Sequence, residues 1–295
     1  MSGKLSGLSR QSGVKTPKSA MGPKAGNKRK EPILPILYAE NLNLSFGGLQ
    51  VLHNISFSVD EGEIFAIIGP NGAGKTSILN CLGGFYLQDS GNITLADQNI
   101  STLSPNRRAA MGIARTFQNI ALFRGMTVLD NIKLGAHTHL KTGLLAAAFY
   151  WGSAHREEMQ LRDEIEDKII DFLEIEHIRK QPVSALAYGL QKRVELARAL
   201  AMRPKVLLMD EPVAGMNAEE TEDMARFILD IQEEWDTTII IIEHDIHMIM
   251  DISDRVMVVN FGQEITTGAP GEVQSHPEVI KAYLGTKKAP ETNIA

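Results

Sequence analysis

The chain has 295 residues, of which 43% are hydrophobic and 22% charged, a composition typical of globular proteins long enough to bury a substantial core. No apolar run approaches the roughly 18 residues that a membrane-spanning helix requires, so any role at a membrane is expected to be indirect. The only cysteine, Cys81, excludes an internal disulfide and fits a reducing cytosol, while 6% aromatic residues and a net charge of −6 argue against nucleic acid as a partner.

Residues 1–32 form a basic segment that is rich in Gly, Ser, Lys and Pro and has no hydrophobic periodicity. Eight Lys and Arg and one acidic residue lie within 1–33, so the rest of the chain carries 22 bases, 35 acids and a net charge of −13. Because the segment cannot bury enough apolar surface to offset the entropy lost on ordering, we predict a disordered N-terminal extension. No apolar stretch follows it, which argues against a secretory signal, and its composition is compatible with both a solvated tail and a tether to anionic lipid.

Strands and helices are expected to alternate from residue 33 onward, as in α/β proteins with a parallel sheet. The first predicted elements are strands at 37–46 and 51–59, joined through Gly47 and Gly48, a buried strand at 63–68, a helix from Lys75 to Gly83 and a strand at 92–95. Residues 125–185 are expected to be mainly helical, with amphipathic spacing through Ile165, Ile169, Ile170, Phe172 and Leu173. The last predicted elements are a strand at 206–209, a helix at 218–235, a strand at 238–242, a helix at 246–252 and a strand at 255–259.

The most specific motif is GPNGAGKT at 69–76, which matches the pattern G-x-x-x-x-G-K-[ST] between a predicted buried strand and a predicted helix. Glycines allow backbone N–H groups to converge on a polyphosphate, and the N-terminus of the following helix adds positive potential. Lys75 is expected to reach the β- and γ-phosphates of ATP, and Thr76 to ligate Mg²⁺. The predicted nucleotide-binding residues are Gly69, Pro70, Asn71, Gly72, Ala73, Gly74, Lys75, Thr76 and Ser77.

Two carboxylates end a second apolar run, VLLMDE at 206–211. Asp210 is predicted to hold Mg²⁺ through water, and Glu211 to polarise the attacking water as a general base. Apolar residues followed by Asp-Glu also occur at ordinary strand ends. Their position about 130 residues after a phosphate-binding motif favours the catalytic interpretation.

Further segments resemble those of ABC ATPases in their order and spacing over about 200 residues. They are Phe46, which lies 23 residues before Gly69, RTFQ ending at Gln118, LAYGL at 186–190 followed by QKRVELAR, AGMN at 214–217, and IIEHD containing His244. Taken singly, each has a simpler interpretation, because Phe46 fits a core aromatic, Gln118 a surface amide and His244 a helix-capping histidine. Together and in this order they favour the resemblance.

The resemblance implies roles for these residues in a sandwich of two ATPase subunits. Phe46 would stack on adenine, Gln118 would touch Mg²⁺ and face a transmembrane partner, and His244 would contact the γ-phosphate. The implied catalytic residues are Lys75, Gln118, Glu211 and His244, the implied metal ligands are Thr76, Gln118 and Asp210, and the implied contacts to ATP bound by the opposite subunit are Ala187, Tyr188 and Gly189.

The implied fold is a P-loop NTPase (RecA-like) core with a mainly parallel sheet, an antiparallel β subdomain and an inserted helical subdomain at about 119–200. It would occupy residues 33–286 as a single ABC ATPase domain, since the chain has no internal repeat. Residues 287–295 would form a flexible C-terminal tail.

Within this family the chain resembles the LivG-type ATPases of branched-chain amino acid importers, over residues 35–286. The segments that carry this resemblance are NIALFRGMTVLDNI at 119–132, the insertion at 135–158 and the ending AYLG at 282–285. It implies a peripheral ATPase at the cytoplasmic face of the inner membrane, with two transmembrane permease subunits, a second ABC ATPase or a second copy of this chain, and an external substrate-binding protein. An ATPase does not touch the cargo, so other amino acids, amides and aromatic acids stay open as substrates.

The segment LAYGL departs from the usual signature LSGGQ, since Ala187 replaces serine and Leu190 replaces glutamine. The lost hydroxyl removes one donor to the γ-phosphate on the opposite subunit, whereas the Gly189 N–H and the helix N-terminus remain. We therefore expect the composite site that uses this segment to be weakened.

Three other functions are compatible with parts of the sequence. An ATPase of the lipopolysaccharide-export type has nearly the same core and a similar ending but is shorter at 135–158. A soluble ABC ATPase would show a long coiled-coil insertion or two P-loops, and the sequence shows neither. A non-hydrolysing subunit is disfavoured by the presence of Lys75, Glu211 and His244. The apolar stretch at 144–151 fits both the core of the helical subdomain and a surface that contacts a partner.

Overall fold

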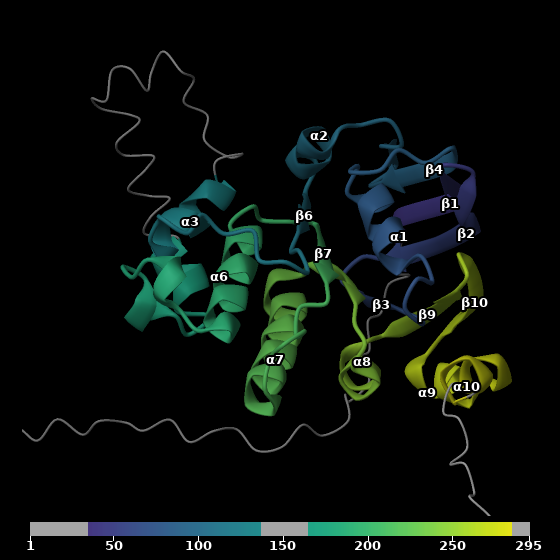
Figure 1. Cartoon of the computed structure of the whole chain (residues 1–295). Helices are drawn as coiled ribbons and strands as arrows, with labels where there is room; N and C mark the ends of the chain where they lie inside the picture. Colours follow the sequence, from purple (N-terminus) through teal and green to yellow (C-terminus); the bar gives the residue numbers. More distant parts are fainter. Residues whose placement is uncertain (1–34, 137–164, 285–295) are drawn as a thin grey trace, which may run out of the picture. The chain divides into compact units, whose positions relative to one another are not determined.

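The computed structural model describes residues 35–136 and 165–284, which form two β-sheets with helices packed against them (Figure 1). The strands are β1 (Pro35–Phe46), β2 (Leu49–Asp60), β3 (Ile64–Ile68), β4 (Ser90–Leu95), β5 (Gln98–Asn99), β6 (Ile113–Arg115), β7 (Val206–Asp210), β8 (Thr238–Ile242), β9 (Arg255–Asn260) and β10 (Gln263–Gly268). The helices are α1 (Lys75–Leu82), α2 (Pro105–Ala110), α3 (Val128–Gly135), α6 (Tyr188–Leu200), α7 (Ala218–Trp235), α8 (Ile246–Ile252), α9 (Pro270–Ser275) and α10 (Pro277–Leu284). A π-helical turn, η2 (Ile165–Ile170), and two 3₁₀ turns, η3 (Glu176–Ile178) and η4 (Val183–Ala185), precede α6. None of the helices in these two ranges has the length and apolarity needed to span a membrane.

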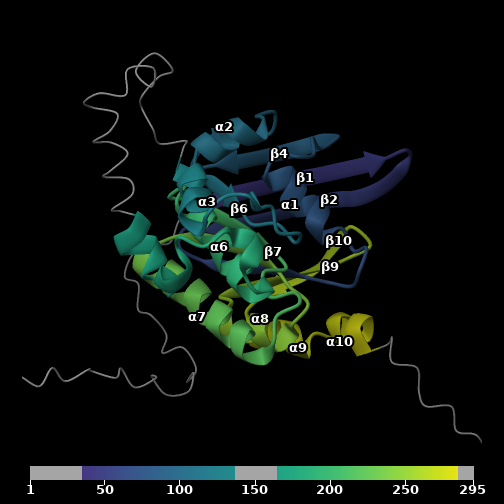
Figure 2. The ribbon, with the colours of Figure 1, turned by 60° about the vertical axis from the view of Figure 1, so that its left-hand side comes forward.

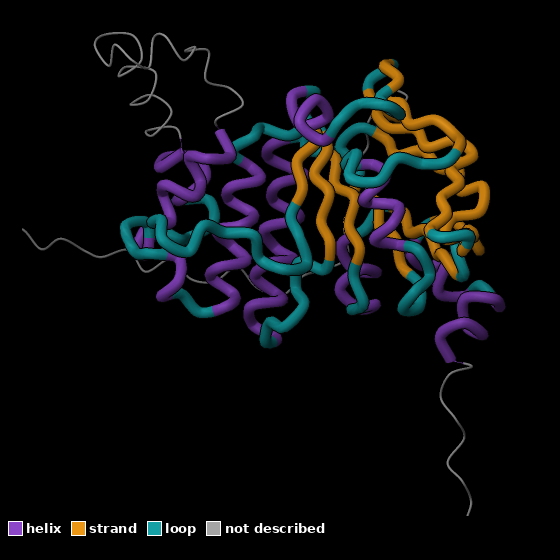
Figure 3. Tube along the Cα trace, turned by 45° about the horizontal axis from the view of Figure 1, so that its top comes forward, coloured by secondary structure: helices purple, strands orange, loops and turns teal. Residues whose placement is uncertain are grey.

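The larger sheet has the strand order β10-β9-β3-β8-β7-β6. Its strands pair in parallel from β9 to β6, and β10 pairs antiparallel with β9. The smaller sheet, with the order β2-β1-β4-β5, is antiparallel throughout. Figure 3 shows the strands running side by side within the described part of the chain. The predicted α/β fold with a mainly parallel sheet and an antiparallel β subdomain is confirmed.

The strand β3 lies near the middle of the larger sheet and is buried on both faces, which explains its uninterrupted apolar sequence. Phe65 and Ile67 pack into the core that β1, β2 and α1 share. Ile64, Ala66 and Ile68 point the other way, into the core formed with α6, α7 and α8, which lie on the same side of the sheet (Figure 2). The larger sheet is therefore a central layer with a hydrophobic core on each face.

Helix α1 is fixed at its C-terminal end by an arginine from α2. Arg108 is only 1% exposed and donates to the carbonyl oxygens of Cys81 (2.5 Å) and Leu82 (2.9 Å) in the last turn of the helix, where carbonyl groups lack partners within the helix. A positive charge at this end of a helix is also favoured by the helix dipole. Burial raises the pKa of the Cys81 thiol to about 11, so this cysteine is an inert core residue.

Most predicted boundaries agree with the structure. The helices α1, α7 and α8 and the strand β8 are confirmed, and β3, β4, β7 and β9 differ from the prediction by one or two residues. The strand β1 ends at Phe46 as predicted but begins two residues earlier, at Pro35, and β2 begins two residues closer to the turn than predicted, because antiparallel pairing continues to Phe46 and Leu49. The strands β5, β6 and β10 and the helices α2, α9 and α10 were not predicted from the sequence. The strands β5 and β6 have two and three residues, too few to show a period, and β10 contains no buried residue that would mark it.

Residues 137–164 lie outside the described residues, and for the rest of 125–185 the prediction of a mainly helical region is only partly correct. Helix α3 is present, and Ile165 and Ile169 are buried in the core as their spacing predicted, but η2 is a π-helical turn. Residues 171–185 contain only 3₁₀ turns, because the backbone of Glu174 adopts a left-handed conformation (φ 58°) that ends the helix. The apolar stretch 144–151, the extension 1–32 and the tail 287–295 lie outside the described residues.

Candidate nucleotide-binding site

The predicted phosphate-binding loop connects the buried end of β3 to the start of α1. An added Cβ at Gly69 would lie 2.0 Å from the carbonyl oxygen of Val259 on β9, so only glycine lets the loop pass this close to the strand. Gly74 stands at the N-cap of α1 with φ 103°, and no side chain caps this end. The N–H groups of the first turn are therefore available to an anion such as a phosphate.

The rest of the loop is shaped by backbone hydrogen bonds. The N–H of Ala73 donates to the carbonyl oxygen of Pro70 (3.1 Å), and the Ala73 carbonyl accepts from the N–H of Gly262 (2.9 Å) in the turn between β9 and β10. Four further predicted nucleotide-binding residues are exposed or half-buried, namely Asn71, Gly72, Thr76 and Ser77. The loop is thus anchored to the sheet on one side and presents a polar tip on the other.

The side chain of Lys75 lies over this loop. Its ammonium group donates to the carbonyl oxygens of Gly69 (2.7 Å) and Pro70 (3.1 Å), and the residue is only 6% exposed. Burial lowers the pKa of Lys75, and the nearby carboxylates of Glu211 and Asp210 partly oppose this shift. The positive charge is therefore held within the loop, close to the two acidic residues.

A hydroxyl and a carboxylate meet at the end of β7. The Oγ1 of Thr76 lies 3.5 Å from Oδ1 of Asp210, and the other oxygen of Asp210 accepts from Arg115 (3.0 Å). Burial raises the pKa of Asp210, whereas the Arg115 guanidinium lowers it. Hydroxyl and carboxylate oxygens are the hard ligands that Mg²⁺ prefers, so this pair fits the predicted metal site. Within the described residues no three His, Cys, Asp or Glu cluster into a metal site, so a metal would also depend on other oxygen ligands.

The side chain of Glu211 is bracketed by two predicted catalytic residues. Gln118 Nε2 donates to Oε2 of Glu211 (2.7 Å), and Nε2 of His244 lies 2.8 Å from Oε1 of the same carboxylate. The backbone of Glu211 is left-handed (φ 49°), and its N–H donates to Ile242 at the end of β8 (2.9 Å). Residues that lie 93 and 33 positions from Glu211 in the sequence thus converge on one carboxylate.

A second carboxylate, Glu243, was not predicted to take part. It is 3% exposed and accepts from the backbone N–H groups of Val213 (2.8 Å) and His244 (2.9 Å). Burial raises the pKa of Glu243, and these two hydrogen bonds partly counter that effect. The residue therefore fixes the backbone that carries His244. The only signal in the sequence is that it directly follows β8.

Two exposed aromatic residues lie beside each other at the edge of the site. Phe46 at the end of β1 is 45% exposed, and its ring contacts that of Tyr86 edge to face, with centroids 5.1 Å apart. Exposed rings of this kind can stack on a purine base. Tyr86 was missed because no motif marks it.

The signature segment lies at the N-terminus of α6. Ala187 is the N-cap and makes no side-chain hydrogen bond there, and Tyr188 is 43% exposed. A Cβ added to Gly189 would lie 2.2 Å from Oε1 of Glu220, which forms a capping box with Asn217 at the start of α7. The signature segment therefore packs against the helix that follows AGMN, and its own helix end stays uncapped by side chains.

Charged residues on α6 hold the backbone around Gln118. The ammonium group of Lys192 donates to the carbonyl oxygens of Phe117 (3.2 Å) and Gln118 (2.9 Å). Glu195 accepts from the N–H groups of Phe117 (3.4 Å) and Ala121 (3.3 Å). Lys192 and Glu195 are 3% and 1% exposed, and neither was predicted from the sequence. Gln118 is thus tied to the same helix that begins at the signature segment.

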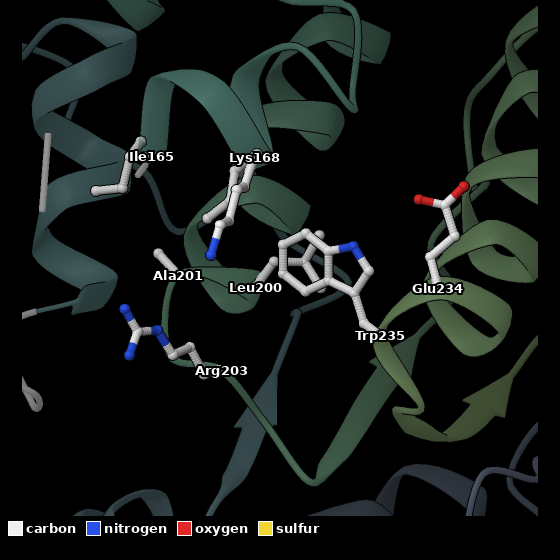
Figure 4. A pocket seen from close by; sticks show the side chains of 8 residues that line it. Ile165, Lys168, Leu200, Ala201, Arg203, Glu234 and Trp235 are labelled. Atoms are coloured by element: carbon white, nitrogen blue, oxygen red, sulfur yellow. The ribbon is translucent and has the colours of Figure 1, made fainter. Parts of the chain in front are cut away.

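A cavity of about 340 Å³ lies away from these residues (Figure 4). Its lining comes from η2, from the C-terminal end of α6 and the turn after it, and from the end of α7, and consists of Ile165, Lys168, Ile169, Leu200, Ala201, Arg203, Glu234 and Trp235. None of the predicted site residues contributes to it, so the site is defined by its hydrogen bonds rather than by the cavity.

Two family matches cover most of this site and the C-terminal end. Residues 52–214 match the ABC transporter family, and residues 263–289 match the family of the branched-chain amino acid ATP-binding cassette transporter. The high-affinity branched-chain amino acid transport ATP-binding protein LivG of Salmonella typhimurium is 41% identical over 251 residues, which cover 85% of this chain and 98% of LivG.

Two further proteins place this similarity in context. The lipopolysaccharide export system ATP-binding protein LptB of Haemophilus influenzae is 34% identical over 252 residues, which cover 85% of this chain and 98% of LptB. A solved ATP-binding cassette of an ABC transporter in its ADP conformation is 32% identical with a TM-score of 0.74, covering 85% of this chain and 99% of the other. The similarity is greater to the amino-acid transport ATPase than to the lipopolysaccharide-export ATPase.

Proposed function

Because this chain belongs to the ATP-binding cassette family of ABC transporters, as an ATPase subunit of the branched-chain amino acid type, we propose that it powers the import of branched-chain or related amino acids. It would do so by closing a dimer of ATPase subunits on ATP and opening it after hydrolysis. The substrate class is supported by the 41% identity with LivG and by the C-terminal match at 263–289.

The observation that carries the catalytic part is the convergence of Gln118 and His244 on the carboxylate of Glu211. A general base must be oriented toward the water that it activates, and two hydrogen bonds of 2.7 and 2.8 Å hold this carboxylate in place. Glu211 would accept the proton of the attacking water. The water oxygen then bonds to the γ-phosphorus, whose bond to the bridging oxygen breaks to leave ADP and phosphate.

The remaining residues would bind and orient the nucleotide. Lys75 and the first N–H groups of α1 would neutralise the β- and γ-phosphates, and Phe46 would stack on the adenine. His244, which lies 2.8 Å from Oε1 of Glu211, would also contact the γ-phosphate. Mg²⁺ held by Thr76, Asp210 and Gln118 would supply positive charge to the phosphate oxygens.

A second ATPase subunit would complete the site. The uncapped N-terminus of α6, with Ala187, Tyr188 and Gly189, would contact the γ-phosphate of ATP bound to the other subunit. That subunit would be a different ABC ATPase or a second copy of this chain.

The membrane partners would be two transmembrane permease subunits, supplied with cargo by an external substrate-binding protein. Gln118 begins the segment that would face them, and Phe123 in the same segment is 58% exposed. Because Lys192 and Glu195 bind this segment to α6, a movement of the signature helix would carry it along. The ATPase would then lie as a peripheral subunit at the cytoplasmic face of the inner membrane.

The proposal is tested by expressing the chain with candidate permease subunits and reconstituting the purified complex with ATP on the side of the ATPase. We expect two very hydrophobic subunits to co-purify and leucine uptake to depend on ATP. Lys75→Ala should bind ATP about ten- to a hundredfold more weakly and abolish uptake, because it removes a charged donor to the phosphates.

Two results would contradict the proposal. ATP hydrolysis by the chain in the absence of any hydrophobic partner, at a rate that such subunits do not change, would favour a soluble ABC ATPase. Co-purification with subunits that bind lipopolysaccharide and carry no amino acid would favour the export type.

A further inference from the structure

Arg115, the last residue of β6, joins four segments of the nucleotide site. Its Nη2 donates to Oδ2 of Asp210 (3.0 Å), and its Nη1 donates to Oδ1 of Asn80 on α1 (2.6 Å). Its guanidinium group also lies over the rings of Phe85 and Phe117, 5.3 and 5.1 Å from their centroids. The side chains of Arg115 and Asp210 are 7% and 3% exposed, so this contact is part of the interior.

The hydrogen bonds leave the two oxygens of Asp210 with different surroundings. Oδ2 is bound to Arg115, whereas Oδ1 faces Oγ1 of Thr76 at 3.5 Å. A carboxylate that accepts a hydrogen bond on one oxygen cannot rotate freely, so Oδ1 is held toward the threonine. The pair of oxygens that fits Mg²⁺ therefore owes its orientation to the arginine.

The planar guanidinium group of Arg115 is itself held in place by neighbouring side chains. Asn80 fixes one end, and the carbonyl oxygen of the same residue accepts from the N–H groups of Phe85 (2.9 Å) and Tyr86 (3.1 Å). The rings of Phe85 and Phe117 lie 81° to each other with centroids 5.7 Å apart and enclose the group. A lysine at this position would carry the charge, but it could not bind Asn80 and Asp210 with a rigid fork or lie flat against a ring.

We propose that Arg115 is a positioning residue that holds Asp210 ready for Mg²⁺. The inference rests on the proposed role of Asp210 as a metal ligand, and it assigns to Arg115 the orienting role that groups behind metal ligands commonly have. Loss of such a group typically weakens metal binding about ten- to a hundredfold.

The test measures binding of a fluorescent ADP analogue to the full-length chain as a function of Mg²⁺ concentration, starting from EDTA. The variants are Arg115→Lys and Arg115→Met, with Arg107→Met on the exposed face of α2 as the matched control. We expect all of them to bind the nucleotide equally in EDTA. Both Arg115 variants should need about ten- to a hundredfold more Mg²⁺ for the half-maximal increase in affinity, whereas the control should match the parent.

A raised Mg²⁺ requirement of Arg115→Lys is the informative result, because this variant keeps the positive charge and loses only the forked geometry of the guanidinium group. Parental Mg²⁺ dependence of Arg115→Lys, or a lower Mg²⁺ requirement of Arg115→Met, would overturn the inference. If Arg115→Met does not fold, as judged by thermal melting, Arg115→Lys and Asn80→Ala decide, since each disturbs the fork without removing the positive charge.

Asp210→Asn separates the inference from the proposal on which it rests. If this variant loses the effect of Mg²⁺ and the Arg115 variants keep it, only the role of Arg115 is wrong. If Asp210→Asn itself keeps the parental Mg²⁺ dependence, Asp210 is not the metal ligand and both assignments fall.

Discussion

The phosphate-binding side of this chain and its signature segment differ in how much of their surroundings the chain itself supplies. On the phosphate-binding side, Lys75, Asp210 and Glu211 each have hydrogen-bond partners from other parts of the same chain. In the signature segment, Ala187 leaves the N-terminus of α6 without a side-chain cap, and Tyr188 is 43% exposed. The first region is organised before any partner binds, whereas the second presents its helix end outward.

Under the proposed function, this contrast corresponds to one region that must be oriented in advance and one that must remain accessible to a partner. Groups that stabilise a developing charge act best when they are already oriented, as the carboxylate of Glu211 is. Groups that contact a nucleotide on another subunit must stay accessible until that subunit arrives. Helix α6 combines the two, because its N-terminus is open while Lys192 and Glu195 further along are buried and bound to the backbone around Gln118.

The largest expected effect comes from removing the proposed base, Glu211, on the organised side. Glu211→Gln keeps the size of the side chain and should leave ATP affinity unchanged, because Lys75 and the loop still bind the phosphates. Hydrolysis should fall by about 10²- to 10⁴-fold, the usual contribution of a general base. Phosphate release and ATP binding are measured on the same preparation. Hydrolysis at the parental rate would mean that another group activates the water.

A smaller effect is expected from completing the signature side. Under the proposed function, Ala187→Ser adds a hydroxyl that would donate to the nucleotide on the opposite subunit, and a hydrogen bond to a charged group is worth about 1.5–3 kcal/mol. In an assembled complex whose only catalytic glutamate is that of the partner, the variant should hydrolyse ATP about ten- to a hundredfold faster if the bond forms in the transition state.

The control for this variant is Ala185→Ser, an exposed position just before the segment, which should have no effect. An unchanged rate for Ala187→Ser, with both sites of the parent equally active, would show that backbone N–H groups suffice. The contrast between the two regions would then be one of structure and not of catalytic strength.

The smallest expected effect concerns the buried contact between α6 and the Gln118 backbone, and it is an effect on stability. Glu195→Ala leaves the N–H groups of Phe117 and Ala121 without their acceptor, which should lower the free energy of unfolding by about 1–3 kcal/mol. Glu195→Gln keeps an oxygen at the same place and should lose much less. Denaturant unfolding distinguishes the two variants. Equal loss in both would indicate that the negative charge beside Lys192, rather than the acceptor, is what stabilises this contact.

The comparison also bears on what could be predicted before the structure. The strand and helix that flank GPNGAGKT and the strand that ends in Asp210 were located correctly, because GPNGAGKT and VLLMDE are contiguous and the local backbone decides what they form. The family resemblance further supplied Gln118 and His244, which no local pattern identifies. The helix boundaries at 75–82 and 218–235 followed from glycines and from apolar periodicity.

The sequence by itself thus determined the fold class, the alternating core strands and the nucleotide motif, which all depend on interactions between near neighbours. Only the tertiary structure brought Arg115 to Asp210 and Lys192 to Gln118, 95 and 74 positions apart. Such contacts depend on strand order and register, because β6 pairs with β7 and thereby sets Arg115 two residues from the level of Asp210. The position of a single arginine or lysine in the sequence does not indicate which carboxylate or carbonyl group it will contact, because the packing of the whole sheet determines that partner.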